Sequence, residues 1–513
     1  MRRARSFSVV FSAALAGAWG VSACSTNPPP VLVPVPPSSA VASSSAEPPP
    51  DALGARPAVA DATPYVPPVP EVFDGPGGSK VWLLERHGLP LVSIVAVASR
   101  GAADEGAQGG LARVTADMLD EGTDRLDALA FSKALEEIGA QLGASADREK
   151  STVHLSVLSA KLSEGLALMG GAVTHPRFGE SDWRRVSSLW VNALKARGDD
   201  PSGVARLVTT ASLWGRDEPY GHPIEGTLTT AKAIKLADAK RWHQGVWQPE
   251  NVTFVVVGDV ARPRLTTELG KAFASWPKAP REPLAAVTVA TPAPAPRVVM
   301  VDRPDAPQVV VTVARRSEKA SSPELPRLEL LNVMLGGSFT SRLNQNLRED
   351  HGWTYGARSG FAPLRQGGTF LARAAIRTDA LSDALRETLG ELRKMAEQGP
   401  SDEEVTKARA LARADVVETY GSLHAIASQL ADHAAQRLPP DQDARTLTAQ
   451  ASASRTDLVP LARQAFQTAD ATIVMVGPRQ PILDALAANK LPAPEERDAE
   501  GRPLPATAAK KGK

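Results

Sequence analysis

The chain has 513 residues, which is too long for one ordinary domain and sufficient for two domains of roughly 200 residues with additional segments. Its 58 Lys and Arg residues nearly balance its 57 Asp and Glu residues, so the formal net charge is +1. This balance excludes binding to nucleic acid or to an anionic membrane surface through overall charge.

The first 23 residues predict an export signal. Three arginines precede an apolar run, 7–21, which is too short for a comfortable membrane-spanning helix. The run ends in Val-Ser-Ala-Cys, which resembles bacterial lipoprotein signals, and Cys24 is the only cysteine. We expect lipidation of Cys24 rather than a buried thiol. Ser25 in place of Asp favours the outer membrane, facing the periplasm, within a bacterial envelope.

Proline-rich segments divide the rest of the chain. Residues 24–70 are Pro, Ala, Ser and Val with little charge, and we expect a lipidated tether because this composition cannot build a core. A similar stretch at 277–296 predicts a linker, and the polar tail 491–513 is expected to be disordered. The expected domains are therefore 71–276 and 297–490.

An internal repeat relates these two domains. Residues 82–97 align without gaps on 299–314, and residues 252–259 align on 471–478, at offsets of 217 and 219. The first pair is expected to be strand, turn, strand in both halves. Between the strands, apolar residues at i, i+3 and i+7 from Leu111 and from Leu328 predict helices. We predict an α+β fold of two homologous domains, each an antiparallel sheet with helices packed on one face.

The order of segments resembles the insulinase/pitrilysin family of zinc metallopeptidases, particularly its two-domain members related to mitochondrial processing peptidase. The likeness runs from about Tyr65 to Leu486 and is carried by 87–90, 110–123, 135–140, 219–221 and 252–259. It implies α+β domains that pair into a four-domain chamber around a peptide.

Active members carry H-x-x-E-H on a helix, where two imidazoles one turn apart bind Zn²⁺ and the glutamate activates a water. The matching positions here are Arg113, Ala116 and Asp117. A further glutamate ligand is expected in a helix that ends in Asp-Asp-Pro, and its position falls on Asn192 or Ala193. The resemblance therefore implies a degenerate motif, without zinc and without catalytic residues of its own.

The sequence offers no replacement metal site. No two of the eight histidines stand at i, i+3 or i, i+4, and a scattered histidine is most often exposed or hydrogen-bonded. Arg113 and Asp117 are one helical turn apart and are expected to form an ion pair on the former ligand face.

The second half retains the residues that face the zinc in the family. Residues 347–356 match the family's Arg/Tyr pair at Arg348 and Tyr355. The resemblance implies that the guanidinium grips a substrate carbonyl and that the phenol donates to the peptide or oxyanion, at a site built by the other chain. Alternatively, Arg348 pairs with Glu349 or Asp350 and Tyr355 simply packs.

A second match concerns peptide binding through the main chain. Ser145, Ala146 and strand 151–158 match the family's edge strand, on which a peptide adds as an extra strand. A purely structural strand is the equal alternative.

These observations lead to one main hypothesis. The chain is expected to be the non-catalytic, substrate-binding subunit of a heterodimeric zinc metallopeptidase that degrades peptides in the bacterial cell envelope. A homologous partner bearing H-x-x-E-H would hold the zinc. The alternatives are a peptide-binding or scaffold pseudopeptidase lipoprotein without a peptidase partner, and an active peptidase with unorthodox ligands.

Overall fold

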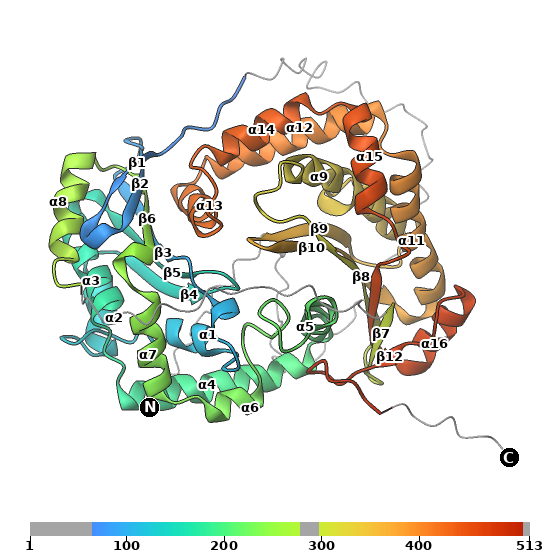
Figure 1. Ribbon diagram of the computed structural model, residues 1–513, viewed down its shortest axis with the longest axis horizontal. Coiled ribbons are helices and arrows are strands. Elements are labelled where there is room, and N and C mark those ends of the chain that lie inside the picture. The colour runs from blue at the N-terminus through green and yellow to red at the C-terminus, as the bar shows by residue number, and fades with distance from the viewer. Residues whose placement is uncertain (1–63, 277–296, 506–513) are drawn as a thin grey trace, which may run out of the picture. The chain divides into compact units, whose positions relative to one another are not determined.

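The computed structural model describes residues 64–276 and 297–505 (Figure 1). The expected export signal, Cys24, most of the tether and the linker 277–296 lie outside the described residues. Within the described ranges, no helix is both long and apolar enough to cross a membrane.

Two six-stranded sheets organise the two halves, with the orders β1-β2-β6-β3-β5-β4 and β12-β7-β11-β8-β10-β9. Five strands of each sheet follow the same order, so the predicted duplication and α+β class are confirmed. The strands are β1 (Glu71–Asp74), β2 (Lys80–Glu85), β3 (Leu91–Ala98), β4 (Gln141–Ala146), β5 (Ser151–Leu158), β6 (Val252–Gly258), β7 (Val298–Asp302), β8 (Gln308–Ser317), β9 (Ala357–Leu364), β10 (Gly367–Arg377), β11 (Thr472–Gly477) and β12 (Glu495–Glu496).

The strand pairing differs from the predicted hairpins. β6 inserts between β2 and β3, and β11 inserts between β7 and β8. β2 and β3 run in opposite directions, so β6 is antiparallel to β3 and parallel to β2. In the second sheet β11 is likewise antiparallel to β8 and parallel to β7. The sheets are therefore mixed. The inserted strands are almost wholly apolar and buried, which fits a central position with neighbours on both sides.

Sixteen α-helices are described, eight in each half (Figure 1). They are α1 (Leu111–Ala116), α2 (Ala128–Glu137), α3 (Leu162–Thr174), α4 (Glu180–Asp199), α5 (Pro201–Trp214), α6 (Leu228–Ala233), α7 (Leu236–Val246), α8 (Arg262–Ala272), α9 (Leu325–Asn332), α10 (Arg342–Asn344), α11 (Leu381–Gln398), α12 (Asp402–Thr419), α13 (Leu423–Ala435), α14 (Gln442–Ser452), α15 (Arg455–Ala465) and α16 (Arg479–Ala488). Two π-helical segments, Val333–Gly337 and Gln345–Asp350, follow α9 and α10.

Each half places one helix on the sheet of the other half. On α5, Val204 and Val208 are buried against valines of β7, β8 and β11, among them Val310. On α13, Ile426 and Leu430 are buried against valines of β3 and β6. Within each half, the other helices of that half pack on one face of its own sheet, as expected, and the opposite face is covered by the helix from the other half. The reason is that valines point to both sides of these central strands, so both faces require an apolar cover.

Two terminal segments are more ordered than expected. β12 lies in the predicted disordered tail, pairs with β7 at Glu495 and Glu496, and is followed by Arg497, which donates to Ser212 Oγ at 3.1 Å. β7 would otherwise be a bare edge strand, and β12 satisfies its backbone groups. In the predicted tether, the Tyr65 ring packs edge-on against Tyr420 with centroids 6.2 Å apart.

Candidate functional site

The former ligand face of α1 carries an ion pair. Arg113 Nε lies 3.0 and 3.2 Å from the two carboxylate oxygens of Asp117, as predicted. Ala116, at the position of the family's general base, is buried and carries no polar group. Burial raises the pKa of Asp117, although Arg113 opposes this shift. The Arg113 guanidinium and the Asp117 carboxylate thus neutralise each other at the two positions where the family has metal ligands.

The remaining degenerate positions do not complete a site. Asn192 and Ala193 lie exposed on α4, which contacts α1. Across the residues that the structure describes, no group of three or more His, Cys, Asp or Glu side chains is placed to hold a metal ion. The three ligand positions hold an arginine, an aspartate that is paired with that arginine, and an amide or methyl group, and this set does not suit Zn²⁺.

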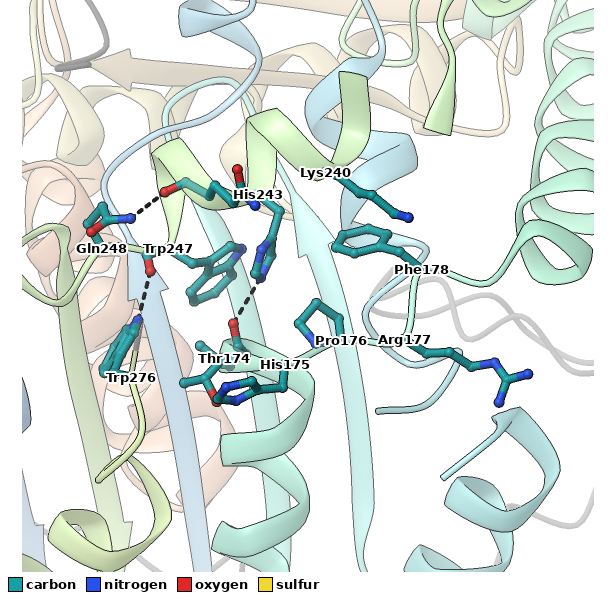
Figure 2. Close-up of a pocket in the computed structure, with 12 residues that line it drawn as sticks. Thr174, His175, Pro176, Arg177, Phe178, Lys240, His243, Trp247, Gln248 and Trp276 are labelled. Carbon is teal, nitrogen blue, oxygen red and sulfur yellow. Dashed lines mark hydrogen bonds between the residues drawn. The ribbon is translucent and has the colours of Figure 1, made fainter. Parts of the chain in front are cut away.

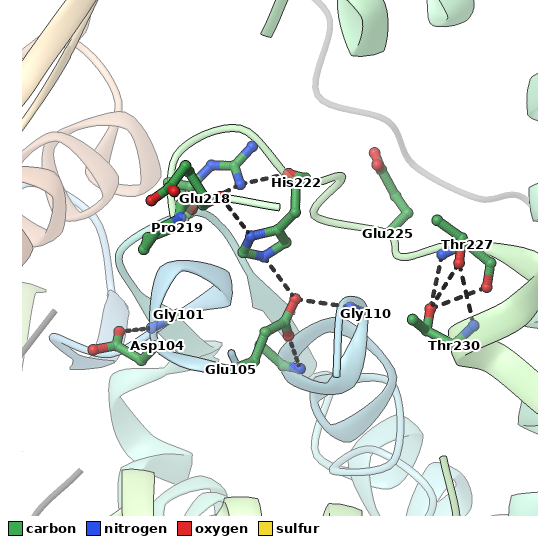
Figure 3. A network of polar contacts seen from close by, with 12 residues as sticks. Gly101, Asp104, Glu105, Gly110, Glu218, Pro219, His222, Glu225, Thr227 and Thr230 are labelled. Carbon is green, nitrogen blue, oxygen red and sulfur yellow. Dashed lines mark hydrogen bonds and ion pairs between the residues drawn. The ribbon is translucent and has the colours of Figure 1, made fainter. Parts of the chain in front are cut away.

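The start of α1 is held by a buried acid, Glu105 (Figure 3). Its carboxylate accepts the backbone N–H of Gly110 at 2.8 Å and that of Ala112 at 2.7 Å. His222 Nε2 lies 3.1 Å from Glu105 Oε1, while His222 Nδ1 lies 3.1 Å from the Glu218 carbonyl. Since a carbonyl only accepts, Nδ1 carries a hydrogen, and a second proton must lie between Nε2 and Glu105. Burial raises the pKa of Glu105, with His222 and the two amides opposing.

This network continues towards the second half. Arg148, in the β4–β5 turn, donates to the His222 carbonyl at 2.6 Å. The next residue, Glu149, accepts from the Tyr220 hydroxyl and from the backbone N–H of Arg365 in the β9–β10 turn. The helix that lost its metal ligands is therefore still positioned by a fully partnered set of buried groups. None of these residues was predicted to be a site residue, and Tyr220 entered only as part of the matching segment 219–221, because the His222–Glu105 and Tyr220–Glu149 contacts that link the network span more than 70 positions.

Of the retained pair Arg348 and Tyr355, the arginine has partners in the chain and the tyrosine is exposed. Arg348 lies in the π-helical segment Gln345–Asp350, with Nε 3.2 Å from Glu349 Oε1 and its guanidinium 4.7 Å from the centre of the Phe339 ring. Gly352 ends the segment with φ of +64°, which favours glycine. Tyr355 is 93% exposed. The alternative reading thus holds for the Arg348–Glu349 ion pair and is wrong for Tyr355, which does not pack.

Phe339 was missed in the sequence and belongs with this pair. It is 63% exposed and its ring lies beneath the Arg348 guanidinium. A bulky aromatic residue inside Gly-Gly-Ser-Phe-Thr, a stretch otherwise typical of turns, was the available signal. Among the described contacts, none joins Arg348 or Tyr355 to the α1 face of the same chain.

The expected edge strand is misassigned by one strand. β5 is interior, paired with both β3 and β4, and β4 forms the edge of the sheet. Ser145 and Ala146 do lie on this edge strand, and Ser145 Oγ lies 2.8 Å from Thr152 Oγ1. The error arose because β4 contains Gly143 and small polar residues and is the weaker strand in sequence.

The histidines are mostly structural, as expected. His243 lines a cavity of about 470 Å³ between α3 and α7, where its Nε2 donates to the Val173 carbonyl at 2.8 Å (Figure 2). Burial lowers the pKa of His243 to about 4, so the ring is neutral. The tertiary structure also brings His154 and His424, from different halves, to a ring separation of 6.1 Å. Their spacing in sequence gave no sign of this.

The sequence matches two family models. One, described as insulinase (peptidase family M16), matches residues 92–226, and the other, described as the peptidase M16 inactive domain, matches residues 233–411. Together these matches span more than half of the chain. The chain belongs to the insulinase (peptidase M16) family.

Curated M16 relatives carry contrasting names. An uncharacterised zinc protease of Mycobacterium tuberculosis is 26% identical over 371 residues, covering 70% of this chain and 82% of that protein. A protein of Helicobacter pylori named non-peptidase homolog YmxG is 25% identical over 330 residues, covering 63% of this chain and 74% of its own length.

Solved structures of other proteins share the fold. A peptidase M16 inactive domain from Pseudomonas fluorescens superposes with a TM-score of 0.74 at 24% identity, over 80% of this chain and 98% of that one. The first half of the periplasmic protease PqqL from Escherichia coli gives a TM-score of 0.66 at 15% identity, over 83% of this chain and 97% of that one.

Proposed function

We propose that this chain is a non-catalytic, substrate-binding subunit of a heterodimeric M16 zinc metallopeptidase that degrades peptides in a bacterial cell envelope. The partner is a homologous chain that bears H-x-x-E-H and binds the zinc. This chain closes the chamber and contributes Arg348 and Tyr355 to the partner's site. It is anchored through lipidated Cys24, with the outer membrane, facing the periplasm, as its location.

The observation that carries this proposal is the contrast between two sites. The Arg113–Asp117 ion pair occupies the position of the metal ligands, whereas Tyr355 exposes nearly its whole side chain. Tyrosine and arginine are both enriched in binding hot spots, and here the arginine covers an exposed phenylalanine ring. An exposed phenol is also free to donate a hydrogen bond to an oxyanion held by another chain.

Two comparisons support a paired, non-catalytic role. The H. pylori relative is named a non-peptidase homolog. This chain matches 48% of the periplasmic protease PqqL and nearly all of its first half, so a unit of this fold occurs there next to a second half of the same protein. A pair of separate chains would reproduce that arrangement.

The test is reconstitution with an M16 partner that carries the intact motif. The two chains are expected to purify as a complex that contains one zinc and hydrolyses peptides, whereas this chain alone is expected to contain no zinc and to be inactive. Tyr355→Phe in this chain is expected to lower hydrolysis without releasing the partner. Unchanged hydrolysis would remove the role given to Tyr355.

A second candidate is a peptide-binding or scaffold pseudopeptidase without a peptidase partner, which the non-peptidase name of the H. pylori relative favours. Peptide binding by the isolated chain, together with failure of every motif-bearing M16 chain to associate, would support it. An active peptidase with unorthodox ligands is tested by metal analysis, since stoichiometric zinc in the isolated chain would contradict both non-catalytic proposals.

A further inference from the structure

A groove of about 460 Å³ lies where the N-terminus of α13 meets the outer face of the first sheet. Of the described residues that line it, none is acidic. Its polar groups are the guanidinium of Arg86, the hydroxyls of Ser93, Ser156 and Ser422, and the imidazole of His424. Leu89, Leu91 and Leu423 supply an apolar wall. Every polar side chain of this groove can therefore donate a hydrogen bond.

Ser93 is the least expected member of this groove. The residue is 4% exposed and lines the groove, and among the described contacts none is a hydrogen bond to its hydroxyl. On β3 its neighbours Val92 and Ile94 point into the core of the first half, so Ser93 points to the opposite face, beside Val95. Its hydroxyl is therefore available to donate a hydrogen bond to a ligand in the groove.

The duplicated half provides an internal comparison. Arg86 donates to the Tyr420 carbonyl at 2.9 Å, two residues before Ser422, the N-cap of α13. Its counterpart Arg303 donates to the Gly198 carbonyl, two residues before Asp200, the N-cap of α5. The two arginines therefore hold their helices in the same way, but the N-cap residue is Ser422 in one junction and Asp200 in the other.

In the second half the junction already contains an anion. The Asp200 carboxylate accepts the N–H groups of Ser202 and Gly203 at 3.0 and 2.9 Å. The sheet floor at the positions of Ser93 and Ser156 is apolar there, with Val310 and Ala375 packed in the core against α5. In the first half the acid is replaced by a serine and both floor positions are hydroxyls.

We propose that this groove binds a phosphate group, either free phosphate or the monoester of a small molecule with an apolar part. The guanidinium, the first-turn amides of α13 and three hydroxyls supply more donors than the two oxygens of a carboxylate can use. The leucine wall and the volume leave space for an apolar substituent. This site is separate from the Arg348/Tyr355 pair and does not depend on the proposed peptidase role.

The test is calorimetric titration of the full chain with inorganic phosphate and with phenyl phosphate. Arg86→Gln and Ser93→Ala are each expected to weaken binding about tenfold or more. Ser422→Asp is the decisive variant, because it installs the carboxylate found at Asp200. It is expected to abolish binding while preserving the fold, since aspartate and serine are comparable helix caps.

Ser401→Asp, at the N-cap of α12, is the matched control and is expected to leave phosphate affinity unchanged. Tighter binding of phenyl phosphate than of inorganic phosphate would assign the groove to an organic monoester, and the reverse to free phosphate. Absence of binding of both probes at millimolar concentration, or full binding by Ser422→Asp, would overturn the proposal. So would a preference for benzoate over phenyl phosphate.

Discussion

The carboxylate of Glu149 accepts the backbone N–H of Arg365 at 2.9 Å to Oε2 and 3.1 Å to Oε1, and it also pairs with Nε of that arginine at 3.2 Å. The two residues are 216 positions apart and lie in the tips of the β4–β5 and β9–β10 turns. Tyr220 adds its hydroxyl to the same carboxylate. One buried acid thus joins the two halves.

Glu149→Ala is expected to destabilise the chain by about 3 kcal/mol, because it leaves a largely buried guanidinium and a backbone N–H without their acceptor. Urea unfolding measures this difference. Asp379→Ala, which breaks the exposed Arg377–Asp379 ion pair, is the control and is expected to have a much smaller effect on stability. Equal effects of the two substitutions would contradict a role of Glu149 in joining the halves.

Glu105→Ala is expected to destabilise the chain by about 3 kcal/mol or more, since two amides at the start of α1 and the His222 ring lose their partner. Glu105→Gln keeps one acceptor and is expected to be intermediate. Thermal unfolding of both variants is the measurement. An alanine variant as stable as the glutamine variant would show that Glu105 does not position α1.

Glu329 predicts a specific dependence of stability on pH. Burial, with the nearby Asp443 adding to it, raises the pKa of Glu329 to about 7 from an ordinary value of 4.5. At pH 8 the carboxyl is ionised in both the folded and the unfolded chain, and burial of this charge destabilises the folded state. As pH falls through 7 the folded state alone gains the proton, so stability from this group rises until about pH 4.5.

Glu329→Gln is therefore expected to be more stable than the natural chain at pH 8, by up to about 3 kcal/mol, and nearly equal to it at about pH 4. Unfolding at the two pH values checks the difference. Below pH 6.5 His433, whose pKa burial lowers, destabilises both proteins alike, so it cancels from the comparison. A constant difference across this range would be inconsistent with a raised pKa at Glu329.

Tyr355→Ala is expected to leave the unfolding free energy within about 0.5 kcal/mol of the natural value, because the side chain is exposed. In the reconstituted complex, the same change is expected to lower peptide hydrolysis by roughly 100-fold or more, as loss of an oxyanion donor does. Leu129→Ala removes another strongly exposed side chain, on α2, and is the matched control. A loss of activity in both variants would point to assembly and not to the phenol.

Much of the fold was predictable because its signals are local. The strands 82–97 and 299–314 were recognised from alternating and continuous apolar runs, and the helices near Leu111 and Leu328 from their spacing. The hairpin pairing was not predictable, since β6 lies about 160 residues beyond β3 and enters the sheet between β2 and β3. Sequence order favours pairing of strands that are neighbours in the chain. The position of β6 is instead decided by its side chains, which are apolar on both faces and are buried when the strand lies in the centre of the sheet.

By itself the sequence determined that Arg113 and Asp117 stand in place of the two histidine ligands, that Ala116 stands in place of the glutamate base, and that Arg348 and Tyr355 remain, because residue identity alone decides whether an imidazole or a general base is present. The tertiary structure decided what surrounds them. It left Tyr355 exposed, connected Glu149 to Arg365 and opened the groove at Ser93, whereas the Arg113–Asp117 pair followed from the spacing along one helix. These relationships depend on two sheets each requiring a helix from the other half to cover a second apolar face, and no local pattern encodes that exchange.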